Sequence, residues 1–293
     1  MAEVKGRARS QASVGILLMC AGVLCLCIND AIAKTLTAGY APLQILFLRS
    51  IIALPFAALI ALKMGGVQAF RTYRPTAHLL RGILWLGAAT LFFSGLSYLG
   101  LAEATALVFI APVFVTALSA LILREHVGWR RWLAVLVGFL GVLVVVRPGT
   151  ATFQMVSLFP LATAFLYAML MISARWVDQR ESVWTLMFYL VATGALLSAF
   201  LAPLFWTDIR TDDIWLFFAI ALFGTAGITL MTQAFRFAPA SVVAPFDYSA
   251  LIWATILGWM LWDEIPDLAT YIGAGIIIMS GVFIVLRERQ LES

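Results

Sequence analysis

Residues 99–125 read LGLAEATALVFIAPVFVTALSALILRE, and residues 237–264 read FAPASVVAPFDYSALIWATILGWMLWDE. Each segment contains an apolar run long enough for a membrane-spanning helix, which needs about 20 such residues. Each run also contains proline and ends at a glutamate, Glu125 in the first and Glu264 in the second. The two segments therefore predict transmembrane helices built on one repeated pattern.

The rest of the chain has the same apolar character. Of 293 residues, 63% are hydrophobic and 12% are charged, with a mean hydropathy of +1.01. Too little polar surface remains to cover a soluble protein of this size, which excludes that class. Windows of about 19 residues predict an all-α membrane protein of ten transmembrane helices, at residues 12–37, 41–62, 79–99, 104–123, 131–147, 154–174, 183–205, 214–235, 240–262 and 268–286. The first run shows no cleavage site before the second span, so we expect it to be retained.

The distribution of positive charge predicts the orientation of these helices, because Lys and Arg gather in short cytoplasmic loops. With the N-terminus placed inside, 15 Lys and Arg residues fall in cytoplasmic segments, and only Arg147 and Arg210 fall in the opposite loops. Both termini are therefore predicted to be cytoplasmic. The same bias accounts for the net charge of +4, so no nucleic-acid partner is needed to explain it.

An internal repeat divides the chain into two halves. Glu125 precedes a helix that ends at Arg147, and Glu264 precedes one that ends at Arg287, so equivalent markers lie 139 (264 − 125) and 140 (287 − 147) positions apart. A unit of five helices crosses the membrane an odd number of times, so its second copy is inverted, an arrangement typical of alternating-access transporters. The predicted organisation is a cytoplasmic tail, two inverted five-helix repeats and a second cytoplasmic tail, at residues 1–11, 12–147, 152–286 and 287–293.

The motifs that the sequence lacks exclude several kinds of chemistry. No G-x-x-x-x-G-K-[ST] motif occurs, so the chain carries no ATP-hydrolysing motor of its own. Its two histidines, His78 and His126, fall in predicted loops, and its three cysteines all lie in the first predicted helix. We therefore expect no metal site and no cofactor. Hydrolase signatures such as G-x-S-x-G are also missing, which argues against an enzyme.

Four ionisable residues inside the predicted spans are the first candidates for substrate binding, because a charge there costs about 2.5–3.5 kcal/mol unless it is paired or wetted. Asp30 and Lys34 lie one helical turn apart, so they either neutralise each other or border a substrate path. Arg49 needs an anionic partner, which Asp30 or a substrate carboxylate could supply. Asp247 follows two prolines, which loosen its helix and expose backbone groups to a cavity.

Polar and aromatic residues of the spans complete the candidate substrate site. Such groups hold a polar substrate by hydrogen bonds and stacking, but they could equally bond to one another between helices. These candidates are Asn29, Trp85, Tyr98, Phe109, Tyr167, Gln233, Tyr248 and Trp253.

The sequence resembles the EamA branch of the drug/metabolite transporter superfamily over residues 13–147 and 152–286. The resemblance rests on the order and spacing of short matches, which are Asn29 and Lys34, Phe47-Leu-Arg49, Ile110-Ala-Pro112, Glu125, the segment Ala238 to Pro245, and Glu264. The chain departs from the family pattern at Arg124 and Asp263, where glycine is usual, and at Leu251, where relatives often have proline. The resemblance implies a carrier of small metabolites.

Three functions remain open at the level of sequence. The first is a secondary transporter of the bacterial inner membrane that exports amino acids, aromatic or of broad range, with S-adenosylmethionine or a nucleotide-type solute as the alternative cargo. The second is an intramembrane enzyme acting on a lipid, which would need two catalytic groups at one depth. The third is an assembly partner, for which the polar, proline-broken segment has no purpose. The transporter fits most features; its partners would be the bilayer and a small-molecule substrate, and a monomer is compatible with the sequence.

Overall fold

The computed structural model describes residues 2–122, 124, 128–148, 154–178, 180–238 and 240–292, in which every regular element is helical. The predicted all-helical fold is thus confirmed for these residues, while the marker Glu125 lies outside them. The α-helices are α1 (Ala2–Thr37), α2 (Pro42–Gly65), α3 (Pro75–Leu96), α4 (Leu101–Val108), α5 (Ala111–Ile122), α6 (Trp129–Val146), α7 (Leu158–Ser173), α8 (Val183–Leu201), α9 (Ile214–Phe237), α10 (Ala240–Val243), α11 (Ala250–Trp262) and α12 (Leu268–Glu292). Short 3-10 helices are η1 (Val67–Phe70), η2 (Met155–Ser157), η3 (Ala174–Trp176), η4 (Ala202–Phe205), η5 (Thr211–Asp213) and η6 (Ala244–Ser249).

Seven helical segments of the described residues are long and apolar enough to cross a membrane, and Trp132–Val146 and Leu268–Phe283 are shorter apolar helices. The predicted span at 240–262 is divided by η6, and the one at 104–123 begins earlier, at Leu101, and is divided between α4 and α5. The chain is therefore a multi-pass membrane protein, whereas ten crossings and the inverted repeat stay predictions.

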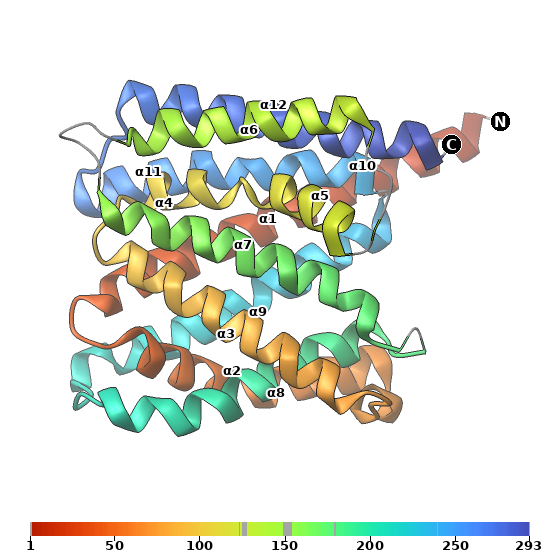
Figure 1. Cartoon of the computed structure of the whole chain (residues 1–293). Helices are drawn as coiled ribbons and strands as arrows, with labels where there is room; N and C mark the ends of the chain where they lie inside the picture. Colours follow the sequence, from red (N-terminus) through yellow and green to blue (C-terminus); the bar gives the residue numbers. More distant parts are fainter. Residues whose placement is uncertain are drawn as a thin grey trace.

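The helices run roughly side by side, with α6 and α12 at one edge of the bundle and α2 and α8 at the opposite edge (Figure 1). Helix α1 passes through the middle, packed against α9 and also in contact with α11. Both α1 and α12 leave the bundle at the same end, which we call the terminal end, and α1 finishes at the far end.

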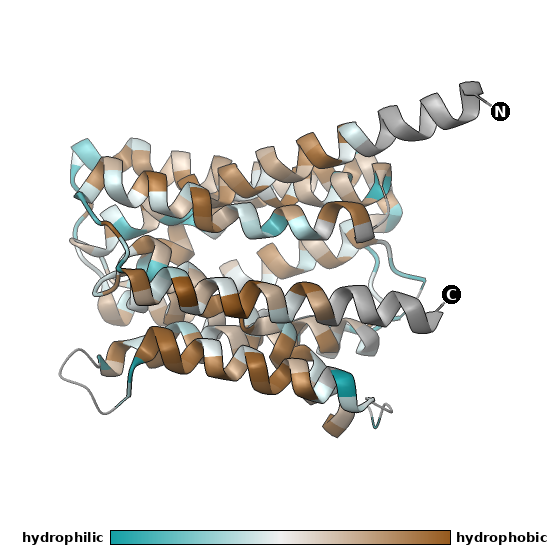
Figure 2. Ribbon diagram, turned by 90° about the horizontal axis from the view of Figure 1, so that it is seen from above, coloured by the Kyte–Doolittle hydropathy of each residue, from teal (hydrophilic) through white to brown (hydrophobic). Residues whose placement is uncertain are grey.

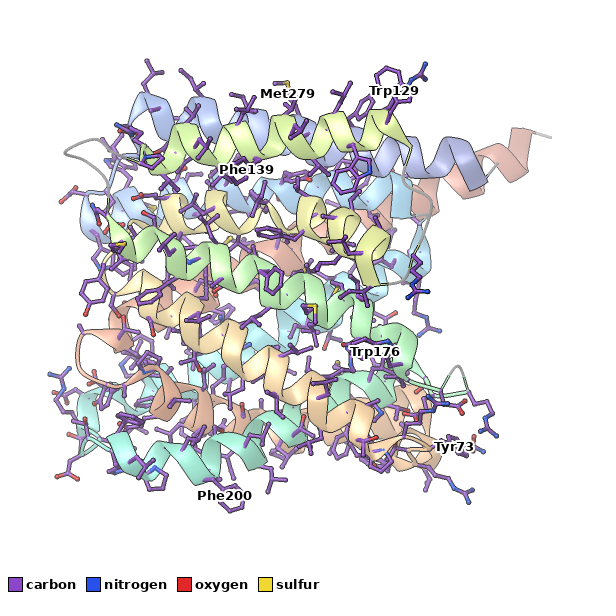
Figure 3. The ribbon with its side chains drawn as sticks, in the orientation of Figure 1. Tyr73, Trp129, Phe139, Trp176, Phe200 and Met279 are labelled. Carbon is purple, nitrogen blue, oxygen red and sulfur yellow. The ribbon has the colours of Figure 1, made fainter. Side chains whose placement is uncertain are left out.

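The outer surface is apolar, as a bilayer requires. Seen from above, hydrophobic residues run along the helices and hydrophilic ones concentrate at the two ends (Figure 2). Phe139, Phe200 and Met279 point outward from three different helices (Figure 3). Their exposed fractions are 53%, 73% and 66%, which in a soluble protein would be an aggregation hazard. We infer that these side chains face lipid.

Helices α1 and α9 approach each other closely at glycines. A Cβ atom on Gly22 would lie only 2.9 Å from the carbonyl oxygen of Gly227, so a side chain there would force the two backbones apart. Small residues at such a contact are how helices associate in lipid, where no hydrophobic force joins them. The register of α1 against α9 is therefore set by this pair.

Among the described residues, three other than glycine adopt backbone conformations that glycine favours: Arg124, Arg147 and Asp263. Arg124 has φ 55° and Asp263 has φ 54°, both in the left-handed region that costs a side-chain-bearing residue energy. Arg124 and Asp263 stand at the two positions where the resemblance implies glycine. Both adopt a backbone conformation that glycine would also adopt there. Asp263 ends α11 and directs the chain to Glu264.

We expect Asp263→Gly to raise the free energy of unfolding by about 1 kcal/mol, because it removes the left-handed strain. The opposite change, Gly66→Ala, should lower it, because Gly66 has φ 68° and open space around it, so only the backbone is affected. Thermal unfolding of both variants in the same detergent measures the two changes in stability. Equal shifts in the same direction would contradict this reading.

A buried polar pair joins the two halves of the chain at the terminal end. His78 Nε2 of α3 lies 2.6 Å from Glu181 Oε2, and both side chains are at most 1% exposed. Glu181 also accepts hydrogen bonds from the Thr72 hydroxyl and the Tyr73 backbone N–H. Burial opposes ionisation of Glu181, but the hydrogen bonds from His78, Tyr73 and Thr72 together hold its pKa below the usual range. The carboxylate therefore stabilises the folded state in its charged form.

The variant Glu181→Gln should lose about 1–3 kcal/mol of unfolding free energy at pH 7, because buried donors lose a charged acceptor. Since the folded pKa is lowered, this contribution is complete above the unfolded value of about 4.3 and disappears as the pH falls through the lower folded value. Melting temperatures of wild type and variant across pH 3 to 7 should therefore converge in acid. The exposed carboxylate variant Asp208→Asn is the control, and a gap that stays constant with pH would refute the assignment.

Candidate functional site

Two interrupted helices meet at the centre of the candidate site. The break between α4 and α5 falls at Phe109 and Ile110, just before Pro112, and η6 interrupts the other segment around Pro245. The rings of Phe109 and Tyr248 meet edge to face with centroids 5.0 Å apart. The Tyr248 hydroxyl rests against α12, because a Cβ atom on Gly281 would lie 2.1 Å from it. The structure thus brings together two aromatic residues predicted from opposite halves.

A cluster of side chains from three helices occupies the part of the site nearer the far end. We call this cluster, which contains Asn29, Asp30, Arg49 and Trp85, the charged group. Asn29 Nδ2 of α1 donates to Asp30 Oδ1 at 2.9 Å, and Asp30 interacts electrostatically with Arg49 of α2. The Arg49 guanidinium lies over the Trp85 ring of α3, 5.7 Å from its centroid. This contact is a cation–π interaction, which suits a planar guanidinium.

The absent side chain of Gly224 makes room for this group. A Cβ atom there would lie 2.6 Å from Arg49 Nη2 and 2.8 Å from Asn29 Oδ1, so α9 packs directly against the charged group. Any larger residue at this position has to displace the guanidinium or the amide. Gly224 is a positioning residue that the sequence did not single out, because glycine is common in transmembrane helices.

Asp247 lies nearer the terminal end, seven residues into its broken span (247 − 240) and about 10 Å deep by helix rise. Its carboxylate interacts electrostatically with Tyr167 of α7, with its neighbour Tyr248 and with Cys27 of α1. Asp247 is nonetheless exposed, and Tyr167 is 44% exposed. Both side chains therefore keep surface that other protein atoms do not cover.

Three buried polar atoms of this region have no hydrogen-bond partner among the described residues: Asn29 Oδ1, Ser249 Oγ and Trp253 Nε1. Asn29 is only 2% exposed. Cys27 connects the groups, since its Sγ lies 3.6 Å from the Ala250 carbonyl oxygen, beside Ser249. Leaving a buried polar atom unpaired costs about 1–3 kcal/mol. Polar groups of a bound ligand would give these three atoms, on α1, η6 and α11, the hydrogen-bond partners that they lack.

Lys34 has a different partner from the one its spacing suggested. Its Nζ forms an ion pair with Glu264 Oε1, donates to the Leu99 carbonyl oxygen at 2.8 Å and lies 5.1 Å from the Trp262 ring centroid. Glu264 Oε2 in turn accepts from the Leu101 backbone N–H at 3.2 Å. One carboxylate therefore ties α1 to the start of α4 and the end of α11, and the Asp30–Lys34 pair considered from sequence does not form.

A cavity of about 310 Å³ lies beside this ion pair. Its polar wall includes Glu103, Glu264 and Asp267 together with Arg147. Arg147 and Asp267 form an ion pair, and the hydrogen bonds from Arg147 and Thr270 outweigh partial burial to lower the pKa of Asp267 to about 2. The charged groups of this end are thus largely paired with one another.

Two predicted site residues stand apart from these groups. Tyr98 is 69% exposed in the turn after α3, and Gln233 lies on α9 without a hydrogen bond to any described residue. Among the described residues no cluster of three or more His, Cys, Asp or Glu could hold a metal ion. The sequence did not predict Glu264 as the partner of Lys34, although Glu264 is a marker of the repeat.

Comparison with known proteins decides the family. The EamA-like transporter family matches residues 13–147 and 154–287. The chain belongs to that family. It is a membrane transporter of the drug/metabolite type and not an enzyme. A solved crystal structure that is 22% identical matches with a TM-score of 0.61 over 98% of this chain and 99% of the other, which shows a shared fold.

Several relatives of this EamA-like transporter carry names of transported solutes. An S-adenosylmethionine uptake transporter of Rickettsia prowazekii is 31% identical, with 91% of this chain and 90% of the relative covered. A riboflavin transporter of Vibrio cholerae is 31% identical over 78% of this chain and 77% of the relative. The pseudopaline exporter CntI of Pseudomonas aeruginosa is 27% identical over 91% of this chain and 94% of the relative.

The variant Gly224→Ala should lower the unfolding free energy by about 1–3 kcal/mol, because an added methyl group forces Arg49 or Asn29 out of place. Gly275→Ala is the matched control, since nothing lies within 4 Å of a Cβ atom at that position of α12. Thermal unfolding in detergent compares the two. A melting temperature of Gly224→Ala equal to that of Gly275→Ala would show that α9 does not confine the guanidinium.

Proposed function

We propose that this transporter is a secondary carrier of the bacterial inner membrane that moves a small metabolite with an amino-acid head group by alternating access. The observation that carries the proposal is the charged group around Arg49. A guanidinium and the carboxylate of Asp30 lie close enough to interact, and an unpaired amide oxygen of Asn29 lies beside them. An α-carboxylate fits Arg49 by bidentate hydrogen bonding. An α-ammonium group fits Asp30 and the amide oxygen of Asn29, an acceptor that otherwise has no donor.

The remainder of the site suits a substrate larger than a simple amino acid. Unpaired Ser249 Oγ and Trp253 Nε1 extend the polar surface from the charged group toward η6, where Phe109, Tyr167 and Tyr248 supply aromatic faces. Aromatic faces stack with heterocyclic bases, and isolated polar atoms fix orientation. S-adenosylmethionine combines an amino-acid head with such a base, and it is the solute in the name of a relative that spans nearly the same length. It is therefore our first candidate substrate.

Free aromatic amino acids are the second candidate, in either direction of transport. The head-group contacts would be the same, and the edge-to-face pair of Phe109 and Tyr248 would receive the side chain. This cargo leaves Asp247 without a partner, which makes it the weaker fit. The residues we propose to contact substrate are those predicted from the sequence, with Lys34, Tyr98 and Gln233 at the periphery.

Counterflow in proteoliposomes tests the proposal. Vesicles loaded with unlabelled S-adenosylmethionine should accumulate the labelled compound, and Arg49→Gln should raise the half-saturating concentration at least about tenfold, because a charge-assisted pair is worth about 1.5–3 kcal/mol. The control is Arg236→Gln, which removes an exposed arginine from the last turn of α9.

Parallel vesicles loaded with phenylalanine or tryptophan separate the two cargoes. Exchange of these amino acids without exchange of S-adenosylmethionine would favour the second candidate. No exchange of either, in protein with a wild-type melting temperature, would overturn the proposal of an amino-acid head group.

A further inference from the structure

The charges inside the spans do not balance around the candidate site. Asp30 and Arg49 oppose each other, Lys34 is paired with Glu264, and Arg81 donates to the Leu170 carbonyl oxygen at 2.9 Å on the end of α7. Asp247 remains. In the described part of the chain its carboxylate makes no hydrogen bond and no ion pair. The site therefore carries one carboxylate without a protein cation.

The groups that face Asp247 cannot supply that cation. From α1 it faces the Cys27 thiol, from α7 the Tyr167 phenol and from η6 the Tyr248 phenol. None of these carries positive charge in any protonation state. An intramembrane carboxylate with no cationic partner is costly in its charged form. A positive charge supplied by a ligand would offset that cost.

The surroundings of Asp247 specify what kind of cation fits. Two of these neighbours are aromatic: Tyr167 is 44% exposed, and Tyr248 is held in place by the Phe109 ring and by Gly281. Aromatic faces attract cations through their quadrupole and need no hydrogen from the ligand, which is how quaternary ammonium groups are recognised. A primary ammonium, in contrast, needs several acceptors, and Asp247 is the single carboxylate at this place among the described residues.

We propose that Asp247, Tyr167, Tyr248 and Phe109 form a subsite for a cation that donates no hydrogen bonds, such as a sulfonium or quaternary ammonium group. This inference deepens the proposed function, on which it rests for the identity of the whole substrate. The head group at Arg49 is neutral as a zwitterion, so the complete substrate has a net charge of +1. The subsite distinguishes a sulfonium from the corresponding neutral thioether, two compounds that differ by one methyl group and one charge.

Binding of S-adenosylmethionine and its thioether S-adenosylhomocysteine measures this distinction directly. In purified wild-type protein we expect at least about tenfold tighter binding of the sulfonium, which corresponds to one desolvated cation–π and charge contact. Asp247→Asn should reduce the preference to about twofold by weakening only the sulfonium, and Asp247→Glu should restore most of it. Tyr167→Phe should keep the preference, whereas Tyr167→Leu should lose it. The matched control is the exposed Asp208→Asn.

A second pair of probes tests the subsite independently of the proposed substrate. Choline and its neutral isostere 3,3-dimethylbutan-1-ol have the same shape and differ in charge. At millimolar concentration choline alone should raise the melting temperature of wild type, since a ligand of the folded state stabilises it by mass action. The rise should vanish in Asp247→Asn and persist in Asp208→Asn.

The outcomes separate the two proposals. An Asp247-dependent effect of choline without any binding of S-adenosylmethionine would support the subsite and refute the proposed substrate. Equal binding of sulfonium and thioether by wild type, or a choline effect that survives in Asp247→Asn, would overturn the subsite. Exchange of S-adenosylmethionine with no preference over the thioether would leave the carrier function standing and the subsite refuted.

Discussion

The close contact between α1 and α9 is the constraint on which the site depends. With Gly22 set against Gly227, the two backbones approach until Asn29 of α1 reaches the surface of α9. Gly224, one helical turn before Gly227, leaves the space in which the Arg49 guanidinium enters from α2. Three helices therefore converge on one charged group because two positions on α9 have no side chain. In lipid, where packing and hydrogen bonds replace the hydrophobic effect between helices, such a contact fixes register as well as distance.

In a membrane protein, the hydrogen-bond partners of buried polar atoms are informative. Water is absent from the hydrocarbon core, so each buried polar atom has to find a partner inside the protein or in a ligand. Most hydroxyl groups of the spans satisfy this within their own helix: Thr90, Thr105 and Thr229 each donate to the carbonyl oxygen four residues earlier. The exceptions among the described residues gather on α1, η6 and α11 and on Arg81. That concentration separates the candidate site from the ordinary hydrogen bonding of a helical bundle.

Local sequence predicted the parts of this fold that local chemistry determines. Apolar runs located the helices, and prolines located the interruptions that bring Phe109 to Tyr248. The partner of Lys34 could not be found in this way: Asp30 lies four residues away, but Lys34 pairs with Glu264, 230 residues away, which the end of α11 brings to the far end of α1. Likewise, nothing in the sequence marks Gly224, since its role depends on which helices pack against it.

Charged residues at different depths of α1 differ in role: some stabilise the fold, and others are proposed to bind substrate. At the far end, Lys34 and Glu264 satisfy each other and also reach the backbone of residues 99 and 101. These two charged groups already have partners in the protein, so a solute gains little by pairing with them. Deeper in the span, Asp30 and Arg49 interact without a close ion pair, and Asp247 has no ion-pair partner among the described residues. Incomplete pairing costs stability in the empty protein, and a ligand that completes it recovers that cost as binding free energy. The same logic makes the site selective, because a ligand of the wrong charge leaves the carboxylate unpaired.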